Sequence, residues 1–328
     1  MVAQTSYVRS ADLGFEREGL LVIPSLNDPG LDTAARRTLL ARFGEIPQVT
    51  SVASSTMAVG GSTSNSGENV QVPGIPGSGP SLRKIDVGEN FFETYGIETL
   101  AGRVFSPEFG RDDALETEAA GDFNIVINRA AVSALGFGSP EEAIGKTVGG
   151  GRPRTIVGVT ENVRYASARA EISPTFYVYW SEPSPFVVAT LRFTGDPRPV
   201  KEAVRAAWET SAGALPLKME TTDQRLEKFY EDDENTARLF AVGAGLAVLI
   251  GMVGLWGLAS FNTARRVKEI GIRKSLGASA TDIVKLLVGQ FMRPVLIANL
   301  IAWPLAYFAM RTWLAGFDDR IALSPGFF

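Results

Sequence analysis

The feature that most restricts the fold of this chain is a pair of uncharged segments near its C-terminal end, separated by a short basic stretch. Residues 239–261 (LFAVGAGLAVLIGMVGLWGLASF) carry no charge, and neither do residues 294–310 (PVLIANLIAWPLAYFAM). A helix rises about 1.5 Å per residue, so roughly 20 apolar residues cross a hydrocarbon core about 30 Å thick. The second segment reaches that length if Arg311 extends its charge toward the interface. We therefore predict a transmembrane hairpin with spans at 239–261 and 292–314.

Charge predicts the orientation of this hairpin. The stretch between the spans holds an excess of cations over Glu269 and Asp282; the cations are Arg265, Arg266, Lys268, Arg273, Lys274, Lys285 and Arg293. An acidic run, 231–234, precedes the first span. Short loops rich in Lys and Arg stay in the cytoplasm, so we expect the turn inside and residues 1–230 outside. Two buried helices of a soluble protein are the alternative, but soluble cores rarely contain so long an uncharged run.

Composition narrows the chemistry that is available to the chain. It has 328 residues, a formal charge of −4, no cysteine and no histidine. This excludes disulfides, thiolate and imidazole nucleophiles, Ser-His-Asp triads and the usual zinc sites. No basic face lies outside the turn, which argues against a nucleic-acid partner. We predict a non-catalytic protein with no metal or cofactor of its own.

The ends of the sequence predict a longer protein. Residues 1–17 show no basic segment followed by an apolar one, so no signal peptide is visible. An outer domain of this size needs a segment that carries it across the membrane. We expect one span before Met1 and another after Phe328.

The outer part predicts an α+β fold. A strand–helix–strand pattern occurs at 20–59, with Asp32 as helix cap, and a second occurs at 186–220, with a helix from Asp196 to Trp208. Two such units commonly form one ferredoxin-like sheet built as a split βαβ. The residues between them predict an inserted, mostly-β subdomain. We expect three domains: an N-terminal segment 1–19, an extracytoplasmic domain 20–230 and a membrane region 223–328. The extracytoplasmic domain combines the split βαβ unit, 20–81 and 186–222, with the insertion 82–185.

Within the insertion, the patterns predict strands at 85–87, 124–128 and 154–159, and a helix at 129–135. Leu100–Arg103 (LAGR) has the composition of a tight turn. Residues 111–121 predict a solvated acidic loop. Paired catalytic carboxylates are the alternative there, but nothing apolar surrounds them to raise a pKa.

Two glycine-containing stretches invite a phosphate-binding interpretation. Residues 60–81 are rich in Gly, Ser and Pro, which predicts a mobile surface loop; a phosphate cradle would need a lysine and a following helix. Gly145-Lys146-Thr147 matches the end of a P-loop, but Pro140 stands where the motif needs glycine, and a strand follows. We interpret it as a turn before a strand.

The basic stretch predicts a short amphipathic helix at 265–277. Glu269 and Arg273 form an i,i+4 pair, Gly277 is a C-terminal cap, and Ser279 with Asp282 forms a capping box for the next helix. Residues 223–238 predict a helix that continues into the first span as a stalk. The spacing alone leaves two interpretations open: a part that transmits a push from a cytoplasmic partner, or a basic loop held by anionic lipid.

A family resemblance bears on this choice. ARRVKEIGIRKSLGASATDIVKLL resembles the signature of FtsX-like permease domains of ABC transporters. Residues 82–180 resemble the MacB-type periplasmic domain through NFFETYGIETLAGRVF, IVINRAAVSALG, EEAIGKTV, TIVGVTENVRY and ISPTFY. The resemblance covers nearly the whole chain, although such modules normally have four spans and only two are found here.

The resemblance implies a permease subunit of the bacterial inner membrane, driven by an ABC ATPase on a separate chain that binds the ATP. It implies export, extraction or mechanotransmission, with the lipid bilayer and a second permease copy or module as further partners. The residues implied to contact the ATPase are Glu269, Ile270, Gly271, Ile272, Arg273, Lys274, Leu276, Gly277 and Ala278.

Two other functions compete with this one. A two-span sensor with an extracytoplasmic ligand-binding domain would use the turn to recruit a signalling protein, but the chain lacks a cytoplasmic output domain. A membrane-anchored hydrolase has only Ser-Lys or paired carboxylates available, because the sequence contains no His or Cys.

Overall fold

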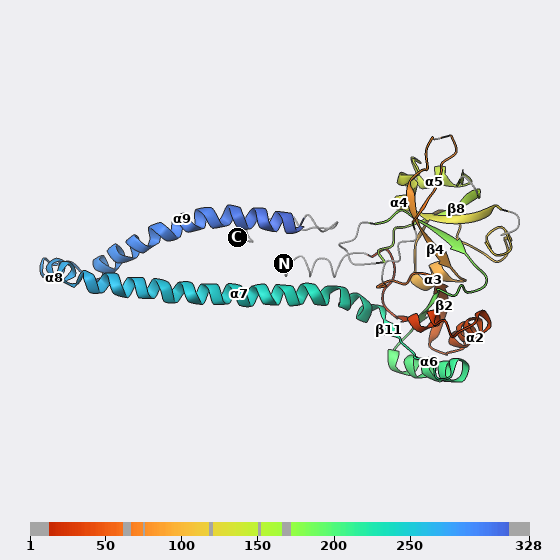
Figure 1. Cartoon of the computed structure of the whole chain (residues 1–328), viewed down its shortest axis with the longest axis horizontal. Coiled ribbons are helices and arrows are strands. Elements are labelled where there is room, and N and C mark those ends of the chain that lie inside the picture. Colours follow the sequence, from red (N-terminus) through yellow and green to blue (C-terminus); the bar gives the residue numbers. More distant parts are fainter. Residues whose placement is uncertain are drawn as a thin grey trace. The chain divides into compact units, whose positions relative to one another are not determined.

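A computed structural model describes residues 13–61, 67–74, 76–117, 121–149, 152–165 and 172–314. The predicted N-terminal segment therefore falls mostly outside the described residues. Contacts between residues divide the chain into two units, one of residues 10–230 and one that contains residues 231 onward. The first unit holds a large mixed sheet and the second consists of helices, and each is described by itself (Figure 1).

The first unit contains the predicted ferredoxin-like half. Its elements in chain order are β1 (Leu20–Ile23), η1 (Pro24–Asn27), α2 (Thr33–Gly44), β2 (Val49–Ser55), and later β10 (Val188–Phe193), α6 (Pro197–Ala212) and β11 (Glu220–Thr221). Strand β10 lies between β1 and β2 and is antiparallel to both, and β11 is antiparallel to β1. The order β11-β1-β10-β2 is that of a split βαβ sheet, so the fold class is confirmed.

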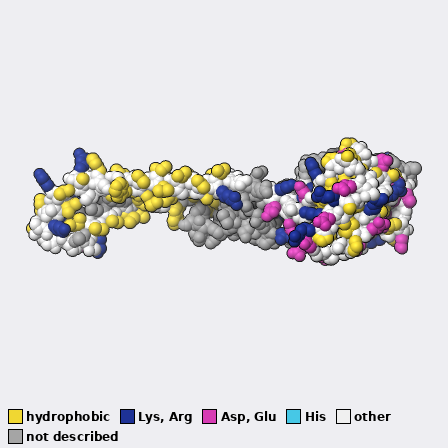
Figure 2. All heavy atoms as spheres, turned by 90° about the horizontal axis from the view of Figure 1, so that it is seen from below, with side chains coloured by type: hydrophobic (Ala, Val, Ile, Leu, Met, Phe, Trp, Pro, Cys, Tyr) yellow, Lys and Arg dark blue, Asp and Glu magenta, His cyan; other side chains and the backbone are white. Residues whose placement is uncertain are grey.

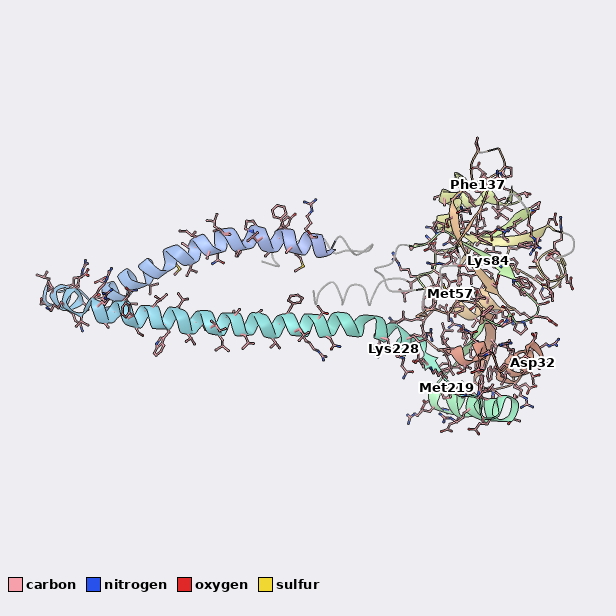
Figure 3. All side chains as sticks on the ribbon, viewed as in Figure 1. Asp32, Met57, Lys84, Phe137, Met219 and Lys228 are labelled. Carbon is pink, nitrogen blue, oxygen red and sulfur yellow. The ribbon has the colours of Figure 1, made fainter. Side chains whose placement is uncertain are left out.

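Local capping and apolar burial explain the two helices of this half. Asp32 accepts a hydrogen bond from the Ala35 amide (2.7 Å) at the start of α2 (Figure 3), and Asp196 accepts one from the Arg198 amide (2.9 Å) before α6. The helices pack on the sheet through a shared cluster that includes Leu39, Phe43, Val200, Val204 and Trp208. The last strand of the second predicted strand–helix–strand pattern is short, at Glu220–Thr221.

The inserted residues continue the same sheet. Their elements are β3 (Gly67–Asn69), β4 (Ser81–Val87), α3 (Phe91–Tyr95), β5 (Thr99–Gly102), β6 (Phe123–Asn128), α4 (Arg129–Ala134), α5 (Pro140–Ala143), β7 (Thr147–Val148), β8 (Arg154–Thr160) and β9 (Thr175–Tyr179). The order is β4-β9-β6-β8-β5, with β3 on β4 and β7 on β8. The predicted strands at 124–128 and 154–159 are confirmed.

The two halves meet at a narrow contact between strands and a wide contact between side chains. Strands β2 and β4 pair only at Ser55 and Val87. Around this pair lies an aromatic cluster in which Phe91, Tyr95 and Tyr177 pack with ring centroids 4.9 to 5.8 Å apart. Buried aromatic side chains therefore contribute to the hydrophobic stabilisation at this junction.

Two of the predicted turns and loops are wrong because pairing partners far away in the sequence order them. Leu100–Arg103, interpreted as a tight turn, contributes its first three residues to strand β5, Thr99–Gly102, which pairs with β8. Gly102 has φ +70°, and a Cβ there would lie 2.2 Å from the Val157 carbonyl oxygen, so glycine serves a close strand contact. Within the stretch 60–81, β3 pairs with β4 and Val70 is only 1% exposed. Residues 62–66 and 75 of that stretch lie outside the described residues.

The interpretation of 111–121 as a solvated acidic loop is also wrong. Asp112 is fully buried and Asp113 is 6% exposed. Asp112 receives two hydrogen bonds from Arg103 (2.5 and 3.0 Å), one from Asn124 Nδ2 (2.6 Å) and one from the Ser106 amide (3.0 Å). These donors compensate the cost of burying a charge. Residues 118–120 are outside the described set.

The second unit contains most of α7 (Thr222–Arg265, 44 residues), with α8 (Val267–Ser275) and α9 (Ala280–Leu314). Two segments are long and apolar enough to cross a membrane: Arg238–Arg265, with mean hydropathy 2.2, and Val295–Thr312, with mean hydropathy 1.3. Figure 2 shows hydrophobic side chains spread along this helical part. The predicted stalk is confirmed as helix, since α7 has no break between Thr222 and Arg265. The limits of the spans stay a prediction.

Candidate functional site: the basic helix between the apolar helices

Helix α8 is separated from α7 by one residue. Arg266 leaves helical geometry (φ −107°, ψ 14°), and its amide donates to the Thr263 carbonyl (3.1 Å). At the other end Gly277 has φ +92°, the left-handed conformation that glycine adopts easily. The Gly277 amide bonds to the Lys274 carbonyl (3.2 Å), and the Ala278 amide bonds to the Arg273 carbonyl (3.0 Å). The predicted C-terminal cap is confirmed.

The start of α9 is fixed as predicted by a capping box. The Ser279 amide donates to an Asp282 carboxylate oxygen (3.1 Å), and the Asp282 amide donates to the Ser279 hydroxyl (3.2 Å). The Ser279 hydroxyl also donates to Asp282 (2.6 Å), and these hydrogen bonds from Ser279 lower the pKa of that carboxyl group. The end of α8 and the start of α9 are thus both determined by hydrogen bonds between residues close in sequence.

The charge on α8 is mainly positive and is held in water. Glu269 pairs with Arg273 at 3.3 Å, as the i,i+4 spacing predicts, and both side chains are about half exposed (47% and 52%). Such an exposed pair contributes only about 0.3–0.5 kcal/mol. The pair therefore steadies the helix slightly and leaves Lys268 and Lys274 as an exposed cationic surface.

Apolar side chains of α8 and of the turn after it are exposed, as are most of those on α7 and α9. Ile272 is 61% exposed and Leu276 is 81% exposed, while Ile270 and Ala278 are half-buried. The nine residues that the resemblance selects thus lie on one contiguous segment, in α8 and the turn that follows it. Their contact with an ATPase stays a prediction.

Gly271 lies in the interior of α8, where glycine is unfavourable. Glycine there costs about 1 kcal/mol relative to alanine. A Cβ at this position would meet no described atom within 4 Å, so intramolecular packing does not require glycine.

The sheet unit offers little acid–base or metal chemistry in the part that the structure describes. No group of three or more Asp, Glu, His or Cys side chains gathers there to hold a metal. The buried tyrosine hydroxyls bond to neighbours: Tyr165 donates to Tyr177 (3.1 Å), and Tyr95 pairs with Thr190 (2.8 Å). Burial raises the pKa of Tyr177 to about 12, which keeps it protonated near neutral pH.

Gly145-Lys146-Thr147 forms a turn before a strand, as interpreted. The Gly145 amide donates to the Ile156 carbonyl (2.8 Å), and the Lys146 carbonyl accepts from the Ile156 amide (2.9 Å). Strand β7 follows directly. These backbone groups are engaged in the sheet, and no helix starts there to hold a phosphate.

Arg225 forms a joint between the base of α7 and the sheet unit, and the sequence gives almost no signal of it. Arg225 Nε donates to the Val59 carbonyl (3.0 Å), and its NH1 lies 3.7 Å from a Glu220 carboxylate oxygen. Gly60 has φ +69°, and a Cβ there would lie 2.6 Å from Arg225 Cβ. Leu226 beside it enters the aromatic cluster. Only the Thr221-x-x-Gln224 capping pattern signals this joint in the sequence.

A sheet-rich α+β unit followed by an apolar, a basic and a second apolar helical segment is the combination expected of a membrane permease with an outer domain. Comparisons with known proteins agree with this class. The family model described as MacB-like periplasmic core domain matches residues 2–207, and that described as FtsX-like permease C-terminal matches residues 241–328. The first match covers more than half of the sequence. The chain therefore belongs to the MacB-like periplasmic core domain family, joined to an FtsX-like permease segment.

Curated relatives are consistent with this membership. The macrolide export ATP-binding/permease protein MacB of Bartonella quintana is 26% identical over 233 residues, which cover 66% of this chain and 32% of that protein. An uncharacterized ABC transporter permease of Methanocaldococcus jannaschii is 32% identical over 104 residues, 31% of this chain and 26% of that protein. The chain spans about a third of the MacB relative's length.

A solved structure with a related description is also similar. The periplasmic region of MacB from Actinobacillus actinomycetemcomitans matches with a TM-score of 0.45 and 14% identity, over 69% of this chain and 98% of that chain.

Proposed function

We propose that this chain is the permease subunit of an ABC transporter, and that α8 is the part that contacts the ATPase. The ATPase is a separate chain and binds the ATP. The observation that carries the proposal is that α8 exposes Ile272 and Leu276 beside an ion pair and a glycine with no packing role. Exposed apolar groups surrounded by charge are typical of protein interfaces.

Orientation supports the same proposal. The cations around α8 favour a cytoplasmic position for the turn, and the sheet unit then lies on the extracytoplasmic side of the inner membrane. Lipid and a second permease copy or module would cover the apolar faces of α7 and α9, whose large side chains are mostly more than half exposed.

Coupling would proceed through α7. ATP binding would close the ATPase pair and displace α8, and a continuous helix carries such a displacement without an intervening loop. The outcome would be export, extraction of a substrate from the membrane, or mechanical signalling to an outer partner. The sheet unit would move and would carry out no chemistry.

The test is copurification with a candidate ABC ATPase that is expressed together with this chain. We expect Glu269→Lys and Gly271→Asp each to abolish copurification. Glu269→Lys forfeits only a weak internal pair, and the Cβ that Gly271→Asp introduces would meet no described atom within 4 Å. Neither variant should therefore unfold the chain.

Matched controls lie on α6, where Glu209 and Ala206 are exposed. Glu209→Lys and Ala206→Asp introduce the same charges on the sheet unit and should leave copurification unchanged. Copurification that survives both substitutions in α8 would contradict the assignment of this helix.

A further inference from the structure

Strand β2 has an open edge inside a cleft. On one side β2 pairs with β10 from Val49 to Ser55, with a register shift at Thr50. On the other side its only partner in the described sheet is β4, at the single pair Ser55 and Val87. Residues 49–54 therefore have no strand beside them on that side among the described residues.

The alternation of backbone directions identifies the groups that face this edge. The Ser54 carbonyl accepts a hydrogen bond from the Gly88 amide (2.8 Å), so the backbone of Ser54 points away from β10. In an antiparallel pair every second residue points the same way, so Val52 also directs its amide and carbonyl to the open side. The register shifts at Thr50, where this alternation no longer holds. The Ser54 carbonyl is already bonded to Gly88, so the Val52 amide and carbonyl are the donor and acceptor with which an added strand would pair.

This edge has no charged residue and no proline to block strand addition, since its sequence is VTSVASS. Its register with β10 shifts at Thr50, so the regular part of the edge runs from Ser51 to Ser55. The strands at the two ends of the sheet differ: β11 has two residues, and β5 has four with an irregular register. Natural sheets generally shorten, bend or charge their edges to prevent pairing with other chains. A longer, uncharged edge that is recessed in a cleft is therefore a candidate binding surface.

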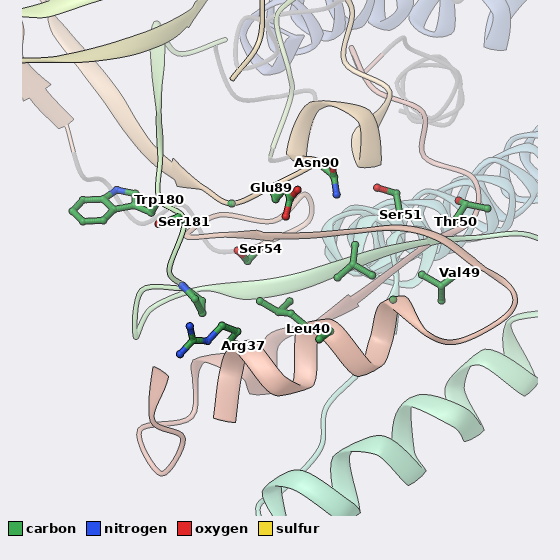
Figure 4. A pocket seen from close by; sticks show the side chains of 15 residues that line it. Arg37, Leu40, Val49, Thr50, Ser51, Ser54, Glu89, Asn90, Trp180 and Ser181 are labelled. Atoms are coloured by element: carbon green, nitrogen blue, oxygen red, sulfur yellow. The ribbon is translucent and has the colours of Figure 1, made fainter. Parts of the chain in front are cut away.

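The cleft has a volume of about 450 Å³ and surrounds the edge. Leu40 and Arg37 of α2 lie on one side of β2, and Glu89 and Asn90 lie on the other (Figure 4). Leu40 with Val52 makes the α2 side apolar, whereas Ser51 and Asn90 make the other side polar. A space of this size holds one extended segment of a few residues, and the packed edge of a second sheet does not fit it.

Charge at the cleft favours a basic flank on the occupant. Arg37 is already paired with Glu182 at 3.6 Å. Glu89 is exposed and has no ion-pair partner among the described residues. A Lys or Arg beside the paired stretch would complement this carboxylate.

We propose that this cleft binds an extended polypeptide segment of a partner protein by strand addition to β2. The segment alternates apolar and polar side chains, with the apolar ones toward Leu40 and Val52, and it carries a Lys or Arg near Glu89. Main-chain hydrogen bonds supply the affinity and the two sides of the cleft supply the selectivity.

The test uses the full chain and a fluorescent peptide, Lys-Thr-Val-Thr-Val-Thr-Lys, with binding measured by anisotropy. The matched probe has the same side chains but carries N-methyl groups on two consecutive central residues, which removes backbone donors from both edges of the peptide. We expect saturable binding of the first peptide and at least about 10-fold weaker binding of the second, because paired backbone groups are lost.

Protein variants make the test specific to this edge. Val52→Pro removes an amide that points to the open side and should weaken binding about 10-fold, while Val52→Ala keeps that amide and should change binding little. If Val52→Pro fails to fold, the two peptides compared on the unchanged chain still decide whether backbone pairing is needed. Glu89→Lys should weaken binding of the Lys-flanked peptide and strengthen binding of a Glu-flanked version.

Three results would overturn the proposal. They are equal binding of the two peptides, absence of saturable binding at millimolar peptide, and binding that is unaffected by the proline and Glu89 variants. A dimer that dissociates on Val52→Pro, without peptide binding, would show instead that a second copy occupies the edge.

Discussion

Among single residues, Arg225 makes the most varied contacts at the base of α7. Its side chain is only 11% exposed, and burial lowers the pKa of its guanidinium group. It connects the helix to the loop after β2 through Val59 and to β11 through Glu220. Removing it would leave the buried Val59 carbonyl without its donor, in a place where water replaces it poorly, and would leave Glu220 with Lys228 as its remaining cation.

We predict that Arg225→Met destabilises the sheet unit by about 1–3 kcal/mol, because the aliphatic volume is kept and the buried polar partners are lost. Lys228→Met is the matched control. Lys228 lies on α7 (Figure 3) and pairs with the same Glu220 carboxylate at 2.5 Å, but its side chain is 59% exposed. Its loss should cost less than about 1 kcal/mol. Denaturant unfolding of the full chain compares the two variants. Equal losses in the free energy of unfolding would contradict the idea that burial makes Arg225 the more important cation.

At the scale of elements, two glycines at the middle and the end of α8 have opposite roles. Gly271 sits inside α8, and Gly277 ends it with φ +92°. Alanine is favoured over glycine in a helix but is strained in the left-handed region. The same substitution should therefore have opposite signs at the two positions.

Gly271→Ala should raise the protection of α8 amides by about 1 kcal/mol, and Gly277→Ala should lower it by about 1 kcal/mol. Hydrogen exchange on the chain in lipid nanodiscs measures both. If the proposed ATPase contact needs close backbone approach at Gly271, the more stable Gly271→Ala variant should still bind the ATPase less well. Equal protection of both variants would show that α8 is not held as a helix in lipid.

The elements that could be predicted are those whose causes lie within a few residues. The cap at Gly277, the box at Ser279 and the cap at Asp32 all belong to this group. Strand β5 could not be predicted, because only its pairing with β8 orders it. The burial of Asp112 depends on Arg103 and Asn124, and the sequence alone does not reveal that these side chains converge.

The candidate site divides in the same way. Helix α8 has a local signature, so the sequence predicts its position. The open edge of β2 and the joint at Arg225 depend on which strands stay unpaired and on how the loop after β2 folds. Neither property is encoded in a short motif.

For the whole molecule, orientation in the membrane is the decisive prediction. The chain has no cysteine, so single-cysteine variants can be labelled without a background. Phe186 is 69% exposed on the sheet unit, and Lys268 is exposed on α8. We expect an impermeant maleimide to label Phe186→Cys in intact inner-membrane vesicles of right-side-out orientation and to label Lys268→Cys only after permeabilisation. Labelling of both from one side would contradict the membrane hairpin.

The stop at Gly277 and the start at Ser279 have a mechanical meaning when taken together. The cap at Gly277 prevents α8 from extending toward α9. The capping box at Ser279 prevents the first turn of α9 from unwinding to lengthen the connection. The two caps therefore fix the length of backbone between a partner bound to α8 and the lipid-facing part of α9. A displacement of α8 would pass to α9 through this short connection without a change in its length.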